Sequence, residues 1–72
     1  MTFDGYISAC AVASRTMKYW RSGQVYFNVL SDIRPDLSEQ IRGWNLDPFH
    51  MDSVLPNFLE WVAANWELKS NA

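Results

Sequence analysis

The chain has almost none of the residues with which small proteins build covalent or metal crosslinks. Among its 72 residues there is one cysteine, Cys10, and one histidine, His50. A lone cysteine excludes an internal disulfide and a Cys-x-x-Cys redox site, and these two residues supply too few soft ligands for a structural zinc. Because an apolar core this small rarely contributes more than ~3–5 kcal/mol, we expect close helix packing or oligomerisation to stabilise the fold.

Long apolar segments and catalytic motifs are also missing. The longest unbroken apolar run is Ala9–Ala13, far short of the ~20 residues that span a bilayer. The opening Met-Thr-Phe-Asp-Gly has neither the basic nor the apolar region of a secretory signal, so we expect a cytoplasmic protein without membrane contact. No P-loop, Gly-x-Ser-x-Gly or Gly-x-Gly-x-x-Gly motif occurs, and the sequence therefore predicts neither an enzyme nor a bound cofactor.

Charge is sparse and unevenly distributed. Charged residues make up 19% of the chain, and the formal net charge is −2. Residues 1–42 carry five basic and four acidic side chains, whereas residues 43–72 carry four acidic side chains and one lysine. The negative balance of the second part disfavours nucleic acid as its partner.

Apolar residues, by contrast, make up 49% of the chain, and their spacing is helical. In 6–20 they recur every three or four residues and fall within an arc of about 100°. We expect Asp4 to cap this helix. A second helix is predicted over 23–33, with Gly23 separating it from the first and Pro35 ending it.

Two further helices follow, separated by a loop. Pro35 suits the first position of a short helix over 35–42, and Gly43 suits its end. The loop 44–52 is expected to insert Leu46 and Phe49 into the core. The last helix is predicted over 53–68, with Ser53 as its cap and Pro56 at its third position. The sequence therefore predicts one all-α domain over 1–72, a small bundle of three to four helices with short loops.

Two residues, His50 and Cys10, have side chains that could carry chemistry. His50 lies between Asp47 and Asp52, which would suit a general base or a metal site, but no second oriented group or pocket is identifiable. We favour a loop histidine, hydrogen-bonded to Asp47. Cys10 lies on the apolar side of the first helix, where a small buried hydrophobe is expected and not a nucleophile. The sequence thus predicts no catalytic residue and no metal ligand.

Basic residues gather at the end of the first predicted helix. Arg15, Lys18 and Arg21 would suit phosphate contacts, and Gln24 and Asn28 on the next helix would suit base recognition. The simpler interpretation is that these cations complement a helix C-terminus. A nucleic-acid-binding regulator using these two helices remains the alternative hypothesis.

Aromatic residues are the one unusual feature of the composition. Four Trp, three Tyr and four Phe are many for so short a chain, and some are expected to remain at the surface. On the last helix, Trp61 and Leu68 lie near one edge of a wide apolar arc, with Leu59 and Trp66 near the other. An exposed edge would form a protein interface, because Trp and Tyr are favoured at binding hot spots. A homodimer formed through this edge is one version of this hypothesis.

One part of the sequence resembles a known group. The stretch from Trp20 to Leu30, then Arg-Pro-Asp-Leu from Arg34, Ile-Arg-Gly from Ile41 and Asp-Pro-Phe from Asp47 are similar to short uncharacterised proteins of bacteria and their prophages. The resemblance covers 20–49. It implies a bacterial or mobile-element setting and carries no activity, cofactor or catalytic residue.

The residues of this pattern have a structural and a functional interpretation. Gln24 and Asn28 would tie the 42–44 backbone or cap a helix end, because buried amides need hydrogen-bond partners, and Arg34 and Arg42 would pair with nearby aspartates. Alternatively, Arg21, Gln24, Asn28 and Arg42 line a recognition surface.

Taken together, these patterns predict a non-enzymatic protein-binding module, and the resemblance favours a phage- or prophage-encoded inhibitor or modulator of a bacterial protein. The expected contact residues are Trp61, Trp66, Leu68, Arg21 and Gln24.

Overall fold

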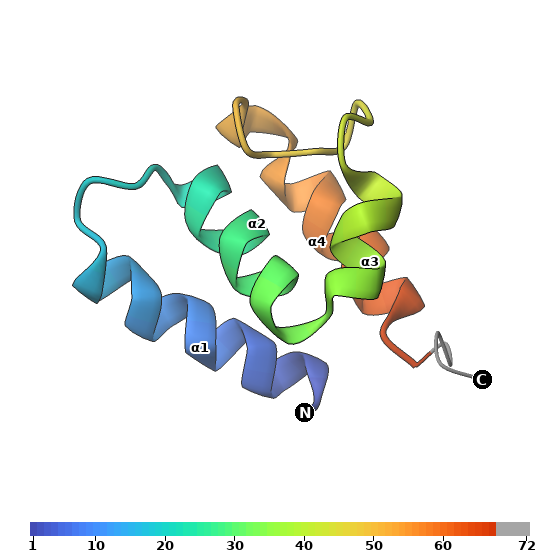
Figure 1. The fold of residues 1–72 in the computed structure, drawn as a ribbon, viewed down its shortest axis with the longest axis horizontal. Helices are drawn as coiled ribbons and strands as arrows, with labels where there is room; N and C mark the ends of the chain where they lie inside the picture. The colour runs from blue at the N-terminus through green and yellow to red at the C-terminus, as the bar shows by residue number, and fades with distance from the viewer. Residues whose placement is uncertain (68–72) are drawn as a thin grey trace.

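The computed structural model describes residues 1–67, and within them all regular structure is helical. The elements are α1 (Phe3–Thr16), α2 (Ser22–Ile33), α3 (Pro35–Ile41), a single 3₁₀ turn η1 (Asp52–Val54) and α4 (Leu55–Asn65) (Figure 1). The predicted all-α bundle with short loops is confirmed.

The first helix begins earlier than its apolar pattern indicated. The Thr2 hydroxyl accepts a hydrogen bond from the Gly5 amide at 3.0 Å, so Thr2 is the N-cap and the prediction of Asp4 is wrong. Asp4 lies inside the first turn, where its carboxylate complements the helix dipole. The helix ends at Thr16, so Met17 and Trp20 belong to the connection that follows.

The boundaries of α2 and α3 follow local chemistry closely. The Gln24 side chain accepts a hydrogen bond from the Arg21 amide at 3.0 Å, which satisfies one of the free donors at the start of α2 and agrees with a capping role. Pro35 occupies the first position of α3, as expected. Gly43 follows α3 with a φ of +81°, a left-handed conformation that glycine adopts at little cost.

The last helix is shorter than predicted at both ends. Ser53 lies in η1 and forms no side-chain cap, and Pro56 is the second residue of α4 instead of the third. α4 ends at Asn65, and Leu68 lies outside the described residues.

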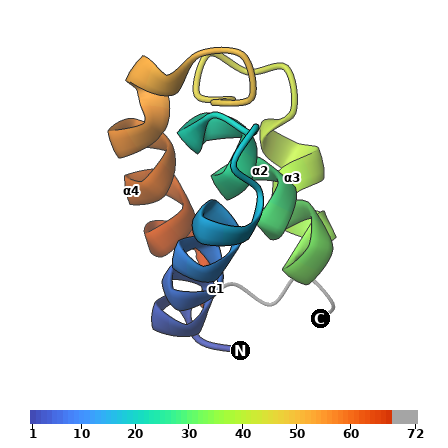
Figure 2. The same cartoon turned by 90° about the vertical axis from the view of Figure 1, so that its left-hand side faces the viewer.

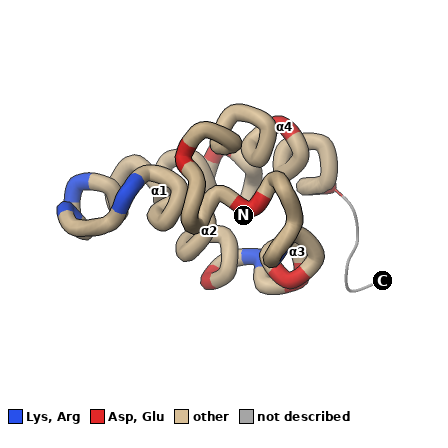
Figure 3. Tube along the Cα trace, turned by 90° about the horizontal axis from the view of Figure 1, so that it is seen from above, with Lys and Arg blue, Asp and Glu red and all other residues tan. Residues whose placement is uncertain are grey.

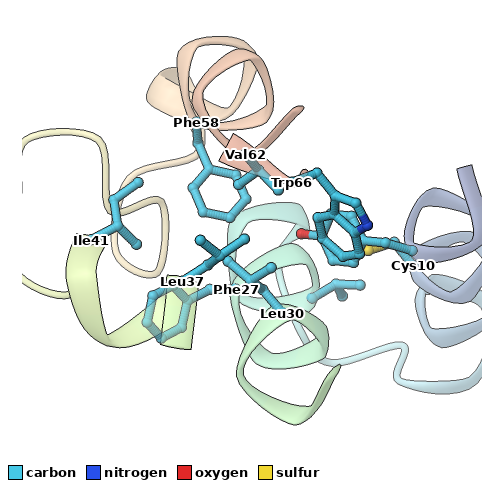
Figure 4. Packing of buried hydrophobic residues seen from close by; sticks show 10 residues of the cluster. Cys10, Phe27, Leu30, Leu37, Ile41, Phe58, Val62 and Trp66 are labelled. Atoms are coloured by element: carbon cyan, nitrogen blue, oxygen red, sulfur yellow. The ribbon is translucent and has the colours of Figure 1, made fainter. Parts of the chain in front are cut away.

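The α2 helix lies at the centre of the bundle. α1 packs along one side of it, and α3 and α4 lie on the other, with the 42–52 loop closing one end (Figures 1 and 2). Buried apolar side chains from all four helices meet in one core (Figure 4). Its members are Tyr6, Cys10, Val25, Phe27, Leu30, Leu37, Ile41, Phe58, Val62 and Trp66. Leu46 and Phe49 pack against this core from the loop, as predicted.

Gly23 allows α2 to approach the loop closely. The helix break expected at this residue occurs earlier, over 17–21, and Gly23 itself is buried inside the first turn of α2. A Cβ atom placed here would lie 2.0 Å from the Pro48 carbonyl oxygen. The Gly23 amide also donates a hydrogen bond to Asp52 at 2.9 Å, which ties the start of α2 to η1.

Trp66 joins the two ends of the described chain. Its indole N–H donates to the Met1 carbonyl at 2.9 Å, and its ring stacks on Tyr6 with centroids 5.4 Å apart. The Arg34 guanidinium lies 5.0 Å from the indole centroid and donates to the Trp66 carbonyl at 2.9 Å. A cation over an indole face is attracted by the ring quadrupole, so Trp66 links α1, α4 and the α2–α3 junction.

Candidate functional site

The structure does not bring together the four predicted contact residues that it describes, and the fifth, Leu68, lies outside the described residues. The prediction that Trp66 lies on an exposed edge is wrong, because its side chain is only 5% exposed. Arg21 and Gln24 lie at the start of α2, where Gln24 serves the helix cap. Trp61 alone is a partly buried indole on the accessible side of α4.

Trp61 has an aromatic partner that the sequence did not identify. The ring of Trp44, in the loop after α3, meets the ring of Trp61 edge to face, with centroids 6.0 Å apart and planes at 74°. Trp44 is 50% exposed. The two residues are seventeen positions apart, on a loop and a helix, so no periodicity in the sequence relates them. We call these two side chains the Trp44–Trp61 pair.

The turn that carries Trp44 is held by hydrogen bonds to the side chain and the backbone of Asp47. Asp47 accepts hydrogen bonds from the amides of Gly43 at 2.8 Å and of Phe49 at 2.9 Å, and its own amide donates to the Trp44 carbonyl at 3.0 Å. Both Asp47 carboxylate oxygens are therefore engaged in the loop itself. These hydrogen bonds fix the conformation of the turn and therefore the position from which the Trp44 indole extends.

A second accessible surface is the groove between α1 and α2. It has a volume of about 430 Å³, and its lining is mostly apolar. The residues are Ala9, Val12, Ala13, Thr16, Met17, Trp20, Asn28, Val29 and Asp32. Val12 is 54% exposed and Met17 43% exposed, so large apolar side chains here remain in contact with solvent.

The basic end of α1 forms a third surface. Lysine and arginine positions are clustered there along the chain (Figure 3), and the neighbouring Tyr19 is fully exposed. Arg21, however, is already engaged: its guanidinium donates to the Phe49 carbonyl and lies 3.8 Å from the Asp52 carboxylate. Arg15 and Lys18 form no ion pair within the part of the chain that the structure describes.

His50 lines a small pocket beside the loop. The pocket, of about 320 Å³, is lined by Phe27, Arg42, Gly43, Asp47, Phe49 and His50. The imidazole packs edge-on against Phe49, with centroids 4.9 Å apart, and the expected hydrogen bond to Asp47 is replaced by the two backbone contacts of that carboxylate. Within residues 1–67, no three His, Cys, Asp or Glu side chains lie close enough to hold a metal ion.

Arg34 and Arg42 each form an ion pair with a nearby carboxylate. Arg34 pairs with Asp36 at 2.9 Å, as predicted, whereas Arg42 pairs with Glu39 at 3.2 Å instead of with an aspartate. The Arg42 guanidinium also lies 5.3 Å from the Phe27 ring. These contacts favour the structural interpretation for both arginines.

Cys10 has the properties of a core residue. Its side chain is fully buried, and burial raises the pKa of its thiol to about 11. Burial likewise raises the pKa of the Tyr6 phenol, which donates to the Tyr26 carbonyl at 2.6 Å. Because the thiolate is the nucleophilic form, Cys10 is poorly suited to covalent chemistry.

The fold is a small all-α bundle, and comparison with known proteins found no match for it. No protein-family model matches the chain, and no curated protein or solved structure is similar to it. Within the described residues, no helix is long and apolar enough to cross a membrane. The surfaces themselves must therefore support any functional argument.

Proposed function

We propose that this chain is a non-enzymatic protein-binding module that contacts its partner through the Trp44–Trp61 pair. The observation that supports this proposal is the half-exposed Trp44 indole, which packs against Trp61 from a hydrogen-bonded turn. A tryptophan that is covered by a partner buries about 150–250 Å², and tryptophans are enriched among the few residues that dominate binding energy.

The geometry also limits the entropic cost of binding. Ordering a flexible side chain at an interface costs about 0.5–1.5 kcal/mol. The Trp44 ring already has a packing partner, and its backbone is held by Asp47. We infer that the pair is largely preorganised for contact.

The setting of this function is part of the same proposal. The resemblance of 20–49 to bacterial and prophage proteins implies a bacterial or mobile-element setting, and in that setting we propose a cytoplasmic inhibitor or modulator of a bacterial protein. Such a role needs neither a catalytic pocket nor a cofactor. The small size of the chain and the partly exposed Trp44–Trp61 pair are compatible with it.

Replacing Trp44 by alanine is expected to weaken partner binding about 30-fold, the effect of a hot-spot loss of about 2 kcal/mol. The measurement is affinity capture from bacterial lysate with quantitative mass spectrometry, followed by titration of the recovered protein. Tyr19→Ala is the matched control, because it removes a fully exposed aromatic from a different surface. Trp61→Ala should reproduce the loss while far-UV circular dichroism remains unchanged. Binding that survives both Trp44→Ala and Trp61→Ala would contradict the proposal.

The basic end of α1 favours a second candidate function, binding of nucleic acid. Arg15 and Lys18 are the cations without an ion-pair partner among the described residues, so about two phosphate contacts are available. The logarithm of DNA affinity should then fall with the logarithm of salt concentration with a slope near −2, and the affinity should fall on Arg15→Ala and Lys18→Ala. Fluorescence anisotropy with a labelled duplex measures both, and a flat titration at low salt would exclude this function.

A further inference from the structure

The Trp44–Trp61 pair places two electron-rich rings side by side at the surface. The ring centroids are 6.0 Å apart and the ring planes meet at 74°, and Trp44 is 50% exposed. A cation is attracted to an indole face when it lies within about 6 Å of the ring centroid. Because the two planes are nearly perpendicular, one cation beside the contact can lie within that range of both rings.

Two other aromatic rings of the chain already carry an arginine of their own. The Arg34 guanidinium lies 5.0 Å from the centroid of the Trp66 ring, and the Arg42 guanidinium lies 5.3 Å from that of the Phe27 ring. Within the described residues, no cation of the chain takes such a position over either ring of the pair. The pair is therefore open to a cation from another molecule.

The chain around the pair carries negative charge. Residues 43–67 contain four acidic side chains and neither lysine nor arginine. Glu60 directly precedes Trp61 on α4, is exposed, and forms no ion pair within residues 1–67. Carboxylates attract cations over a Debye length of about 8–10 Å. The charge of this region therefore favours a positively charged partner group over a negatively charged one.

We propose that the Trp44–Trp61 pair receives an arginine side chain of the partner protein, with the guanidinium over an indole face. Arginine fits better than lysine, because its planar guanidinium stacks on aromatic rings and is less strongly hydrated. Both cations that already lie over rings in this fold are arginines. This inference rests on the proposed function and adds the chemistry of the partner, which is a basic segment with an exposed arginine.

Titration of the ¹⁵N-labelled full chain with N-acetylarginine amide tests the proposal. The matched ligand is N-acetylcitrulline amide, which has nearly the same shape but carries an uncharged ureido group in place of the guanidinium. Each of the four tryptophans gives its own indole N–H signal in a ¹H–¹⁵N spectrum. The signals of Trp44 and Trp61 should shift with the arginine ligand, and the citrulline ligand should bind at least ~5-fold more weakly, as expected for an exposed cation–π contact.

Two other tryptophans are controls within the same spectrum. The Trp66 ring already carries Arg34, and its N–H donates to the Met1 carbonyl, so its signal should stay in place and report that the fold is intact. Trp20 is 37% exposed and has no ring contact within the described residues. A shift of the Trp20 signal as large as that of Trp44 would show general binding to exposed indoles and overturn the proposal.

Trp44→Leu separates the ring face from simple charge attraction. Leucine keeps an apolar side chain on the turn and leaves every carboxylate in place, but it removes one of the two rings. The Trp61 signal should then lose most of its preference for the arginine ligand, with the Trp66 signal unchanged. An undiminished preference in this variant, or equal binding of the two ligands to the unmodified chain, would overturn the proposal.

These outcomes are independent of the test of the proposed function. Capture of a partner that is lost on Trp44→Ala and Trp61→Ala, together with equal binding of the two ligands, would keep the protein-binding function and reject the arginine contact. Capture that survives both alanine substitutions would reject the function itself.

Discussion

Replacing Gly23 by alanine is expected to destabilise the protein by about 3 kcal/mol or more, at or above the upper end of the usual cost of overpacking. The added methyl group would lie 2.0 Å from the Pro48 carbonyl oxygen and 2.7 Å from an Asp52 carboxylate oxygen. Pro48 is fully buried, so its backbone cannot move aside without disturbing the loop. The hydrogen bond from the Gly23 amide to Asp52 would be lost in the same displacement.

Two opposing effects act at this position, and their magnitudes decide the result. Gly23 is in a helix without a positive φ, so alanine by itself would gain roughly 0.5–1 kcal/mol from the smaller entropy of the unfolded chain. The steric cost exceeds this gain several-fold. A domain of this length has a free energy of unfolding of only ~3–5 kcal/mol. The variant should therefore be largely unfolded in urea concentrations that leave the parent protein folded.

Gly5→Ala is the matched control, because Gly5 is also helical. Its added methyl group would lie 3.0 Å from Met1 Cγ, the middle of a flexible and 74% exposed side chain that is free to rotate away. We expect an unchanged or slightly raised free energy of unfolding, measured by urea denaturation with far-UV circular dichroism. Equal midpoints for Gly23→Ala and Gly5→Ala would show that the contact with Pro48 does not constrain α2.

Trp66→Ala is expected to cost about 3–5 kcal/mol, the range for a large aromatic removed from a core. The substitution removes the stacking on Tyr6, the hydrogen bond to the Met1 carbonyl and the cation–π contact with Arg34 at once. α1 would then lose its main contact with the end of α4. The same urea experiment measures the loss, which should leave little folded protein at room temperature.

Two variants separate the parts of this effect. Trp66→Phe keeps an aromatic ring over Tyr6 but loses the N–H donor, and it should cost about 1–2 kcal/mol. Trp44→Ala removes an indole of the same size from a half-exposed site and should cost about 1 kcal/mol, because less apolar area leaves the interior. Similar losses for Trp66→Ala and Trp44→Ala would contradict the assignment of Trp66 to the core.

The helices could be predicted because their signals are local. Apolar residues at spacings of three and four mark α1, α2 and α4, and Pro35 and Gly43 bound α3 through backbone constraints that need no distant partner. The predictions of where α1 and α4 begin and end were less accurate. Thr2 replaced Asp4 as the cap, because two neighbouring residues both had suitable side chains and only backbone geometry chose between them.

The candidate contact surface was much less predictable. Trp61 lies on α4 and Trp66 directly follows its last residue, yet the first is partly exposed and the second is covered by Tyr6 and Arg34. Their periodicity shows that both are apolar positions, but it contains no information on which neighbour covers them. The half-exposed position of Trp44 has the same cause, since the Trp61 ring that it packs against is on another element.

By itself, the sequence determined the helical class, the bounds of α3 and the exclusion of disulfide and zinc crosslinks, because composition, periodicity and turn chemistry are properties of the chain alone. Tertiary structure decided which aromatics are exposed, why Gly23 has to be glycine and how the exposed residues group into surfaces. Those properties depend on contacts between segments far apart in the chain, such as Trp66 with Met1 and Gly23 with Pro48. They arise only when the helices pack together.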